Sequence, residues 1–302
     1  AQLKHFRRLG IQHIEDPGDA DLLAFHITAP DSYLKRFPDK PIVAHCHGLY
    51  WSEYQWEDWA YKANTEVLKL ICTADITTAP SQWVANVIRR HTSRDVRVVP
   101  HGIDLREWQP PTQDRGYVLW NKTRVDPVCD PEPMNTLSMM MPQQSFVTTF
   151  GEERDNVQVV GRLSYKDAKQ LVRHAGVYLC TTRETFGIGT LEAKASGGRI
   201  VGYAYGAQTE YIEHEKTGFL VEPGDTAGLI AGIKWALENR AIISERVRAK
   251  AAEFSWPAAA QAYRDVYNDA IEKYEQMHTV PRTSIVVTAY NLDKYIGSAL
   301  AS

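Results

Sequence analysis

The sequence predicts an α/β protein in which two domains, each built on a parallel β-sheet, face each other across a cleft. Strand-like and helix-like segments alternate along the 302 residues. The strand-like segments are apolar throughout, which is typical of parallel strands that helices cover on both faces. The segment QPPTQDRG (109–116) interrupts the alternation and indicates a linker between the two series.

The first series predicts an N-terminal domain over residues 1–110. It opens with a helix, AQLKHFRRL, which we expect to end at Gly10. Because no strand precedes this helix, we expect the domain to lack its first strand. A later helix, QWVANVIRRH, follows Ser81, which is a suitable N-cap residue. The expected strands are DLLAFH (21–26), PIVAHCH (41–47), ADITTA (74–79) and VRVVP (96–100).

The second series predicts a C-terminal domain over residues 111–256. Asp225 is expected to cap one of its helices, TAGLIAGIKWALENR. The expected strands are GYVLW (116–120), SFVTTF (145–150), VQVVG (157–161), VYLCTT (177–182), RIVGYA (199–204) and GFLVEP (218–223). After a long helix the chain ends on another strand and helix start, so we interpret residues 283–302 as the truncated start of a following domain.

The composition excludes several classes of protein. A net charge of −3 and a pI near 6.4 do not suit a nucleic-acid binder. The sequence contains neither an apolar run long enough for a membrane span nor a signal peptide. The four cysteines are scattered, and three of them lie in apolar runs. We therefore expect buried free thiols, a cytoplasmic protein and no metal site.

The segment RETFGIGTLEAKASGG (183–198) carries the clearest functional signal. Its glycines permit a tight turn after a strand, and a helix is expected to begin near Ile188. The free N–H groups of that helix would attract phosphate, but the effect is worth only about 0.3–2 kcal/mol, so a cation is also needed. Glu184 and Glu192 would repel phosphate and suit hydroxyl groups instead. A diphosphate with a sugar at each end, a sugar nucleotide, satisfies both requirements.

A dinucleotide-binding turn is a weaker interpretation of the same segment. GIGTLE matches only part of the GxGxxG pattern, because Glu192 stands where the third glycine packs closely against the sheet. The next strand, RIVGYA, is not followed by an acidic residue for the ribose.

The spacing Glu184-x7-Glu192, with TFG and LEAKASGG around it, resembles the E-x7-E signature of the family-4 retaining glycosyltransferases. TAPSQWVANVIRR, VRVVPHGIDLREWQP and GAQTEYIEHEKTGFLVEPGD are also similar to stretches of that family, and the resemblance covers about residues 20–277. It implies the GT-B fold, two Rossmann-like domains, with the helix at about 257–277 packing back on the first domain. The segment TSIVVTAYNLDKYIGSAL resembles the start of a family-2 glycosyltransferase, which implies a larger polypeptide with a second transferase module.

The resemblance also implies roles for individual residues. Glu184 would contact sugar hydroxyls, Glu192 the ribose, and His47 would lie beside the reacting sugar. Which cation meets which phosphate stays open between Lys122 and Arg124. The remaining donor-binding candidates are the amides of Phe186, Gly187 and Ile188, and Arg162 near the base.

The predicted function is transfer of a sugar from a nucleotide-diphosphate sugar to a glycan or lipid-linked acceptor, with retention of configuration and without a metal or cofactor. Two alternatives stay open: a nucleotide-sugar epimerase or hydrolase of the same fold, and a non-catalytic sugar-nucleotide-binding module. The basic stretch IRRHTSR (88–94) is a candidate for peripheral contact with anionic lipid, although a solvated helix end is the simpler interpretation.

Overall fold

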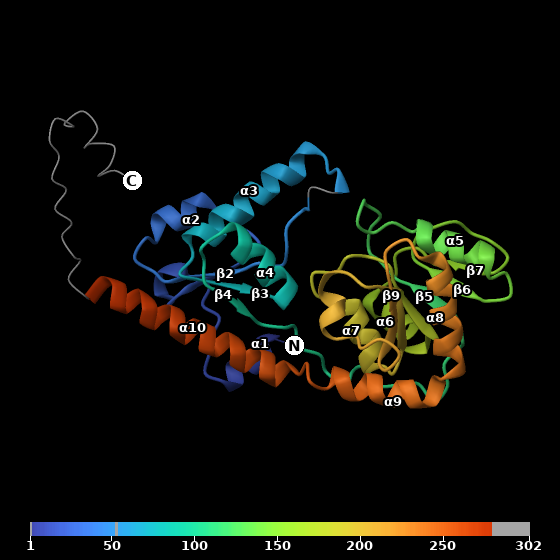
Figure 1. Ribbon diagram of the computed structural model, residues 1–302. Coiled ribbons are helices and arrows are strands. Elements are labelled where there is room, and N and C mark those ends of the chain that lie inside the picture. Colours follow the sequence, from blue (N-terminus) through green and yellow to red (C-terminus); the bar gives the residue numbers. More distant parts are fainter. Residues whose placement is uncertain (1, 52–53, 280–302) are drawn as a thin grey trace.

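The computed structural model describes residues 2–51 and 54–279, which form two α/β domains lying side by side (Figure 1). The first domain contains a parallel sheet of four strands in the order β1-β2-β3-β4. Each strand coincides with a predicted one, so these four predictions are confirmed. The strands are β1 (Leu23–His26), β2 (Ile42–His45), β3 (Ile76–Ala79) and β4 (Val96–Val98).

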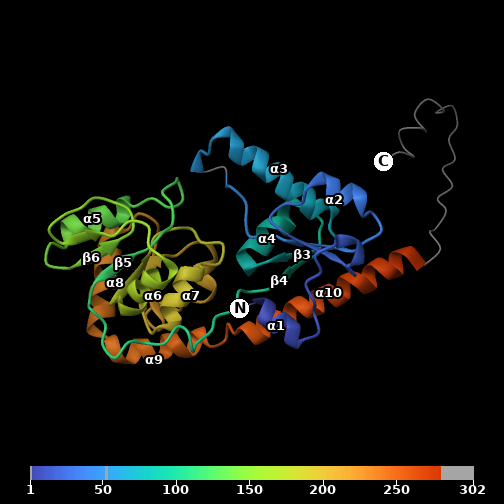
Figure 2. The ribbon, with the colours of Figure 1, turned by 180° about the vertical axis from the view of Figure 1, so that it is seen from behind.

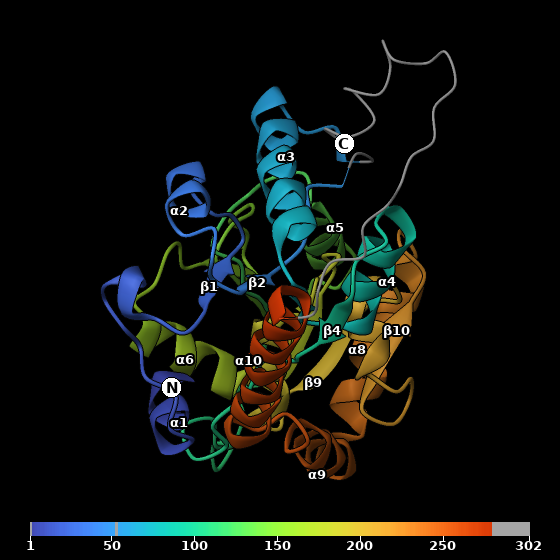
Figure 3. The ribbon, with the colours of Figure 1, turned by 90° about the vertical axis from the view of Figure 1, so that its left-hand side faces the viewer.

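Helices cover both faces of the first sheet (Figure 3). On one face, Phe6 of α1 and Tyr263 and Tyr267 of α10 pack against Val43 of β2 and other strand residues. On the other face, α3 and α4 bury their apolar sides against the sheet. The Ser81 hydroxyl accepts a hydrogen bond from the Val84 amide, which confirms the predicted N-cap. The elements are α1 (Gln2–Arg8), η1 (Pro17–Asp19), α2 (Asp31–Arg36), α3 (Asp58–Thr73), α4 (Gln82–His91) and α10 (Trp256–Thr279).

The second domain contains a parallel sheet of six strands in the order β10-β9-β8-β5-β6-β7. All six strands lie within predicted segments, so the expected second series is confirmed. The chain therefore completes one side of β5 with β6 and β7 and then the other side with β8, β9 and β10, and the loops after β5 and β8 lie next to each other. The strands are β5 (Val118–Trp120), β6 (Phe146–Thr148), β7 (Val157–Val159), β8 (Val177–Cys180), β9 (Arg199–Tyr203) and β10 (Gly218–Val221).

The second sheet also lies between two layers of helices. Leu191 of α7 and Val172 of α6 pack on one face, and Leu137 of α5 and Ile233 of α8 pack on the other. Asp225 caps α8 through a 2.8 Å hydrogen bond from the Gly228 amide, as predicted. The elements are α5 (Glu132–Met140), α6 (Tyr165–His174), α7 (Ile188–Ala195), η3 (Gly206–Glu210), α8 (Thr226–Glu238) and α9 (Arg240–Ala251).

The chain crosses between the domains twice, and the two crossings are joined. The Ile103 amide donates a 2.8 Å hydrogen bond to the Phe254 carbonyl, and Ile103 and Ser255 form an isolated parallel bridge. A Cβ on Gly102 would lie only 2.6 Å from the Cα of Trp256, so the close approach requires glycine there. After the second crossing, α10 runs along the first domain beside α1 (Figure 2).

All four cysteines are free thiols. Cys46, Cys129 and Cys180 are buried, which agrees with the expectation of buried thiols, but that expectation is wrong for Cys72, which is exposed on α3 although it lies in an apolar run. None of the helices within residues 2–51 and 54–279 has the length and hydropathy that a membrane crossing requires. Residues 283–302, where the sequence predicts the start of a further domain, lie outside the described residues.

Candidate active site in the interdomain cleft

The turn between β8 and α7 has the geometry that its glycines predicted. Gly187 precedes α7 in a left-handed conformation, with φ of 86°, and the helix begins at Ile188. A Cβ at position 187 would lie 2.6 Å from the hydroxyl of Tyr211, so both backbone and space demand glycine. The Ile188 side chain is exposed. Phe186 and Gly187 are buried, so Ile188 alone of the three residues predicted to offer amides is exposed at the end of the helix, where an anion is favoured.

Tyr211 stabilises this turn through hydrogen bonds. Its hydroxyl donates a hydrogen bond to the Phe186 carbonyl, and the carbonyl of Tyr211 in turn accepts one from the ammonium of Lys194. The Lys194 side chain is fully buried, and burial lowers its pKa to about 8. Sequence reasoning did not identify either residue, because both support the turn without facing the cleft.

Lys122 and Glu184 form an ion pair at the carboxyl ends of β5 and β8. Their side chains are only 10% and 24% exposed, and Thr182 hydrogen bonds to both of them at 2.7 Å. Burial alone would lower the pKa of Lys122, but attraction to Glu184 outweighs it and raises that pKa. Burial would likewise raise the pKa of Glu184, but Lys122 and the hydrogen bonds lower it. Both groups are therefore charged at neutral pH, and sequence reasoning did not anticipate that they pair.

Glu192 lies one turn into α7 in different surroundings. Burial, followed by repulsion from Glu107, raises the pKa of Glu192 to about 7, and Lys169 counters this only in part. Lys169 is bound to Glu107 by an ion pair of 3.1 Å. Glu192 therefore exchanges a proton near neutral pH, whereas Glu184 stays ionised.

The two candidate arginines differ in position. Arg124 lies in the exposed loop after β5, pairs with Asp126, and is near enough to help lower the pKa of Glu184. Arg162 lies in the exposed turn between β7 and α6, and it makes no ion pair with another described residue.

The histidine predicted for the site, His47, belongs to a cluster at the carboxyl ends of β1, β2 and β4. His47 Nε2 lies 2.9 Å from His26 Nδ1, and the His47 ring stacks on His101 at 5.7 Å. The His101 ring meets the edge of Phe186 at 5.1 Å, which joins the cluster to the α7 turn of the other domain. Burial, followed by neighbouring histidines, lowers the pKa of His47 and takes that of His101 to about 4.

His45 is part of the core of the first domain. It is buried, and its ring nitrogens hydrogen bond with Thr78 at 2.7 Å and Tyr267 at 3.0 Å. Although several histidines lie close together, no group of three or more His, Cys, Asp or Glu in the described part of the chain is arranged to hold a metal ion.

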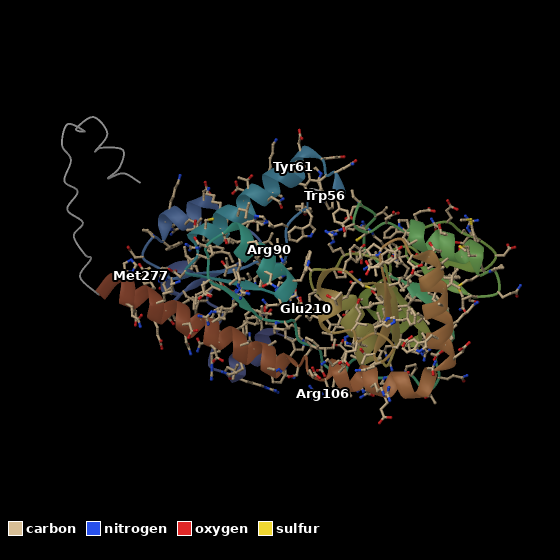
Figure 4. All side chains as sticks on the ribbon, viewed as in Figure 1. Trp56, Tyr61, Arg90, Arg106, Glu210 and Met277 are labelled. Carbon is tan, nitrogen blue, oxygen red and sulfur yellow. The ribbon has the colours of Figure 1, made fainter. Side chains whose placement is uncertain are left out.

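Three further contacts hold the domains together beside this cluster. The Glu210 carboxylate of η3 accepts hydrogen bonds from the Gln82 and Trp83 amides at the start of α4. The Ser81 hydroxyl donates to the Thr185 carbonyl at 2.7 Å. The interdomain contacts of Glu210 and Thr185 could not be predicted from the sequence, since each depends on how the domains meet. Figure 4 shows Glu210 on the side of the second domain that faces the first.

Comparison with protein families covers most of the chain in two parts. Residues 2–107 match the family described as "Glycosyltransferase Family 4", and residues 151–254 match "Glycosyl transferases group 1". Among solved structures, Anabaena Alr3699/HepE in complex with UDP-glucose aligns with a TM-score of 0.67 at 20% identity, over 79% of this chain and 74% of that one. The chain has the GT-B fold.

Another GT-B-type neighbour is TarM of S. aureus, solved with fondaparinux, α-GlcNAc-glycerol and UDP. It aligns with a TM-score of 0.67 at 14% identity, over 81% of this chain and 55% of that one. Both structural alignments are between distant sequences and bear on the fold alone.

Curated relatives match shorter stretches. D-inositol 3-phosphate glycosyltransferase 2 of Catenulispora acidiphila is 36% identical over 92 residues, which is 30% of this chain and 22% of the relative. Glycogen synthase of Mycobacterium tuberculosis is 31% identical over 143 residues, 46% of this chain and 32% of the relative. The chain thus matches no more than about a third of the length of these two relatives.

Proposed function

We propose that the protein is a retaining glycosyltransferase that moves a sugar from a nucleotide-diphosphate sugar to a glycan or lipid-linked acceptor. The observation that carries the proposal is the α7 turn, which brings together the start of a helix, an ion-paired glutamate and a second glutamate one turn later. These groups match the parts of a sugar nucleotide in order. The family matches of both domains and the UDP complexes of structural neighbours support the same donor class.

In the proposed complex the diphosphate lies at the amides of Phe186, Gly187 and Ile188. Lys122 supplies positive charge there without moving, because Glu184 and Thr182 already hold its ammonium. Only Oε1 of Glu184 takes part in these contacts among the described residues, so Oε2 is left to accept a hydroxyl of the transferred sugar. Glu192 accepts the ribose hydroxyls, Arg124 approaches the phosphates, and Arg162 lies toward the base.

In the proposed reaction, a bond forms between the acceptor oxygen and the anomeric carbon while the bond from that carbon to the phosphate oxygen breaks. The acceptor proton passes to the leaving diphosphate on the same face, which retains the configuration. His47 is neutral at pH 7 because its pKa is lowered, so it hydrogen bonds to the sugar without adding charge. Positioning and charge stabilisation, without a protein nucleophile or a metal, are the protein's contribution. We place this reaction in the cytoplasm, in a larger polypeptide.

A thermal-shift screen with UDP-, GDP- and ADP-sugars tests the donor assignment. We expect one nucleotide class to raise the Tm of the wild-type protein and of Glu238→Ala, which changes an exposed glutamate on α8. Glu192→Ala should lose the shift. Equal shifts in wild type and Glu192→Ala would exclude the ribose role. Release of free sugar without any acceptor would instead favour a hydrolase.

A further inference from the structure

Aromatic residues are concentrated between β2 and α3, at one rim of the cleft. Aromatic residues make up 10% of the whole chain but half of residues 50–61. Three of them, Tyr50, Trp56 and Trp59, form an aromatic triad with ring centroids 4.9, 5.0 and 5.9 Å apart. The rings meet edge to face, at angles of 71–78°, so each triad member has a face that the others do not cover.

The triad is fixed in place, and one of its members, Trp59, is open to solvent. The Asn64 side chain hydrogen bonds to both the amide and the carbonyl of Tyr50 at 2.8 Å, which ties the segment to α3. Trp59 is 49% exposed at the start of that helix. Adjoining large aromatic side chains that are partly exposed form the kind of surface patch that marks a binding site.

The triad lies beside the proposed donor site. The segment follows directly after His47, and its Tyr54 lies under the guanidinium of Arg183 in the other domain, 5.4 Å from the ring centroid. Tyr50 also lies near enough to Arg124 of the other domain to make a small contribution to raising the pKa of that guanidinium. Figure 4 shows Trp56 at the end of the first domain that faces the second. A molecule bound on the triad would therefore extend toward the sugar of the donor.

The polar atoms around the triad identify the kind of molecule. Trp56 Nε1 is buried and has no hydrogen-bond partner among the described residues, so an N–H donor is left over within the cluster. Glu57 and Asp58 stand beside it as exposed acceptors. Apolar ring faces combined with a donor and carboxylates match a pyranose, which has one face of C–H groups and a rim of hydroxyls.

The charge of residues 50–61 argues against a lipid bilayer as the partner that binds the aromatic triad. Residues 50–61 contain three acidic and no basic residues. Anionic membranes attract Lys and Arg, by about 1 kcal/mol each near the surface, and repel carboxylates. We propose that the aromatic triad binds the acceptor of the reaction, and that the bound part of the acceptor is an uncharged saccharide. This inference rests on the proposed function and specifies the chemical class of its acceptor.

Saturation-transfer NMR with uncharged gluco-, manno- and galacto-oligosaccharides tests the inference without requiring turnover. We expect wild type to bind at least one of them, and Trp59→Ala to bind it at least about tenfold more weakly. Trp56→Phe keeps an aromatic ring and removes the orphan N–H, so it should lose about threefold to tenfold. The matched control is Tyr33→Ala, an exposed aromatic on α2 outside the segment, which should bind as wild type does.

The donor and acceptor assignments fail separately in this design. If a nucleotide sugar still stabilises the protein but no oligosaccharide binds, or Trp59→Ala binds as well as wild type, the inference is wrong and the proposed function stands. Co-sedimentation with phosphatidylserine vesicles that depends on Trp59 would also overturn it. If saccharides bind through Trp59 while no nucleotide sugar binds, the triad is a saccharide site and the proposed function fails. The Tm of each variant without ligand checks that it folds.

Discussion

The carboxylate of Glu210 in the second domain accepts a 2.9 Å hydrogen bond from the backbone amide of Gln82 in the first. The same carboxylate accepts a bond from the next amide, Trp83, so it satisfies two of the free N–H groups at the start of α4. The positive end of the helix also favours the carboxylate. The neighbouring contact, from the Ser81 hydroxyl to the Thr185 carbonyl, reaches the residue that follows Glu184, so the interdomain contacts adjoin the proposed donor site.

We predict that Glu210→Ala opens the cleft. Hydrogen bonds to charged groups are worth about 1.5–3 kcal/mol each, and partial exposure places these near the low end. Small-angle scattering should give a larger radius of gyration for Glu210→Ala than for Glu238→Ala, while circular dichroism stays unchanged. The same radius in both variants would show that Glu210 does not hold the domains.

Lys122→Ala should destabilise the second domain strongly, because it leaves the Glu184 carboxylate partly buried without its counter-ion. Breaking one member of a buried pair typically costs about 3–5 kcal/mol. Urea unfolding should show this loss, and adding Glu184→Gln to Lys122→Ala should recover most of it. If the double variant is no more stable than Lys122→Ala, the charge of Glu184 is not the cause.

Glu192 makes stability depend on pH. Its pKa in the folded protein, about 7, is above the ordinary value of 4.5. The protonated form is therefore favoured by folding, and this contribution is complete below pH 4.5 and is lost as the pH rises through about 7. Glu192→Gln has no carboxyl group at this position and so lacks this pH-dependent contribution to stability. The difference in Tm between Glu192→Gln and wild type should thus grow between pH 4.5 and 7 and then level off. A difference that is constant with pH would contradict the raised pKa.

Gly48→Ala should force the domains apart beside His47. Gly48 has φ of 136°, which L-residues rarely adopt, and a Cβ there would lie 2.5 Å from Thr185 Cγ2 in the other domain. We expect a lower Tm and a larger radius of gyration in scattering. Combining the change with Thr185→Ser removes the methyl group and should restore the radius but not the full Tm, since the backbone strain remains. If adding Thr185→Ser does not reduce the radius of gyration, the effect of Gly48→Ala comes from backbone strain alone.

The sheets could be predicted from the sequence because parallel strands are buried on both faces and read as short apolar runs. Val118–Trp120 and Val177–Cys180 show this, and each lies within its predicted segment. The helix N-caps at Ser81 and Asp225 could also be predicted, because a cap is a local interaction between a side chain and an amide three residues away.

Contacts between distant segments could not be predicted in the same way. Lys122 and Glu184 are 62 residues apart and meet only because β8 lies next to β5, which is a matter of strand order. His26 was not expected beside His47 for the same reason, since β1 and β2 are neighbours in the sheet. The contact between Glu210 and the start of α4 is harder still to predict, because it depends on how the two whole domains dock. The functional roles of these residues stay predictions.

The two chain crossings, joined at Ile103 and Ser255, limit how the two domains can move relative to each other. A single flexible linker would let one half swivel freely against the other, whereas two backbones bonded side by side bend readily in one direction and resist torsion. Opening and shutting should therefore follow one repeatable arc. After each opening, the histidines of one domain would return to face the same turn in the other, with no search over wrong orientations.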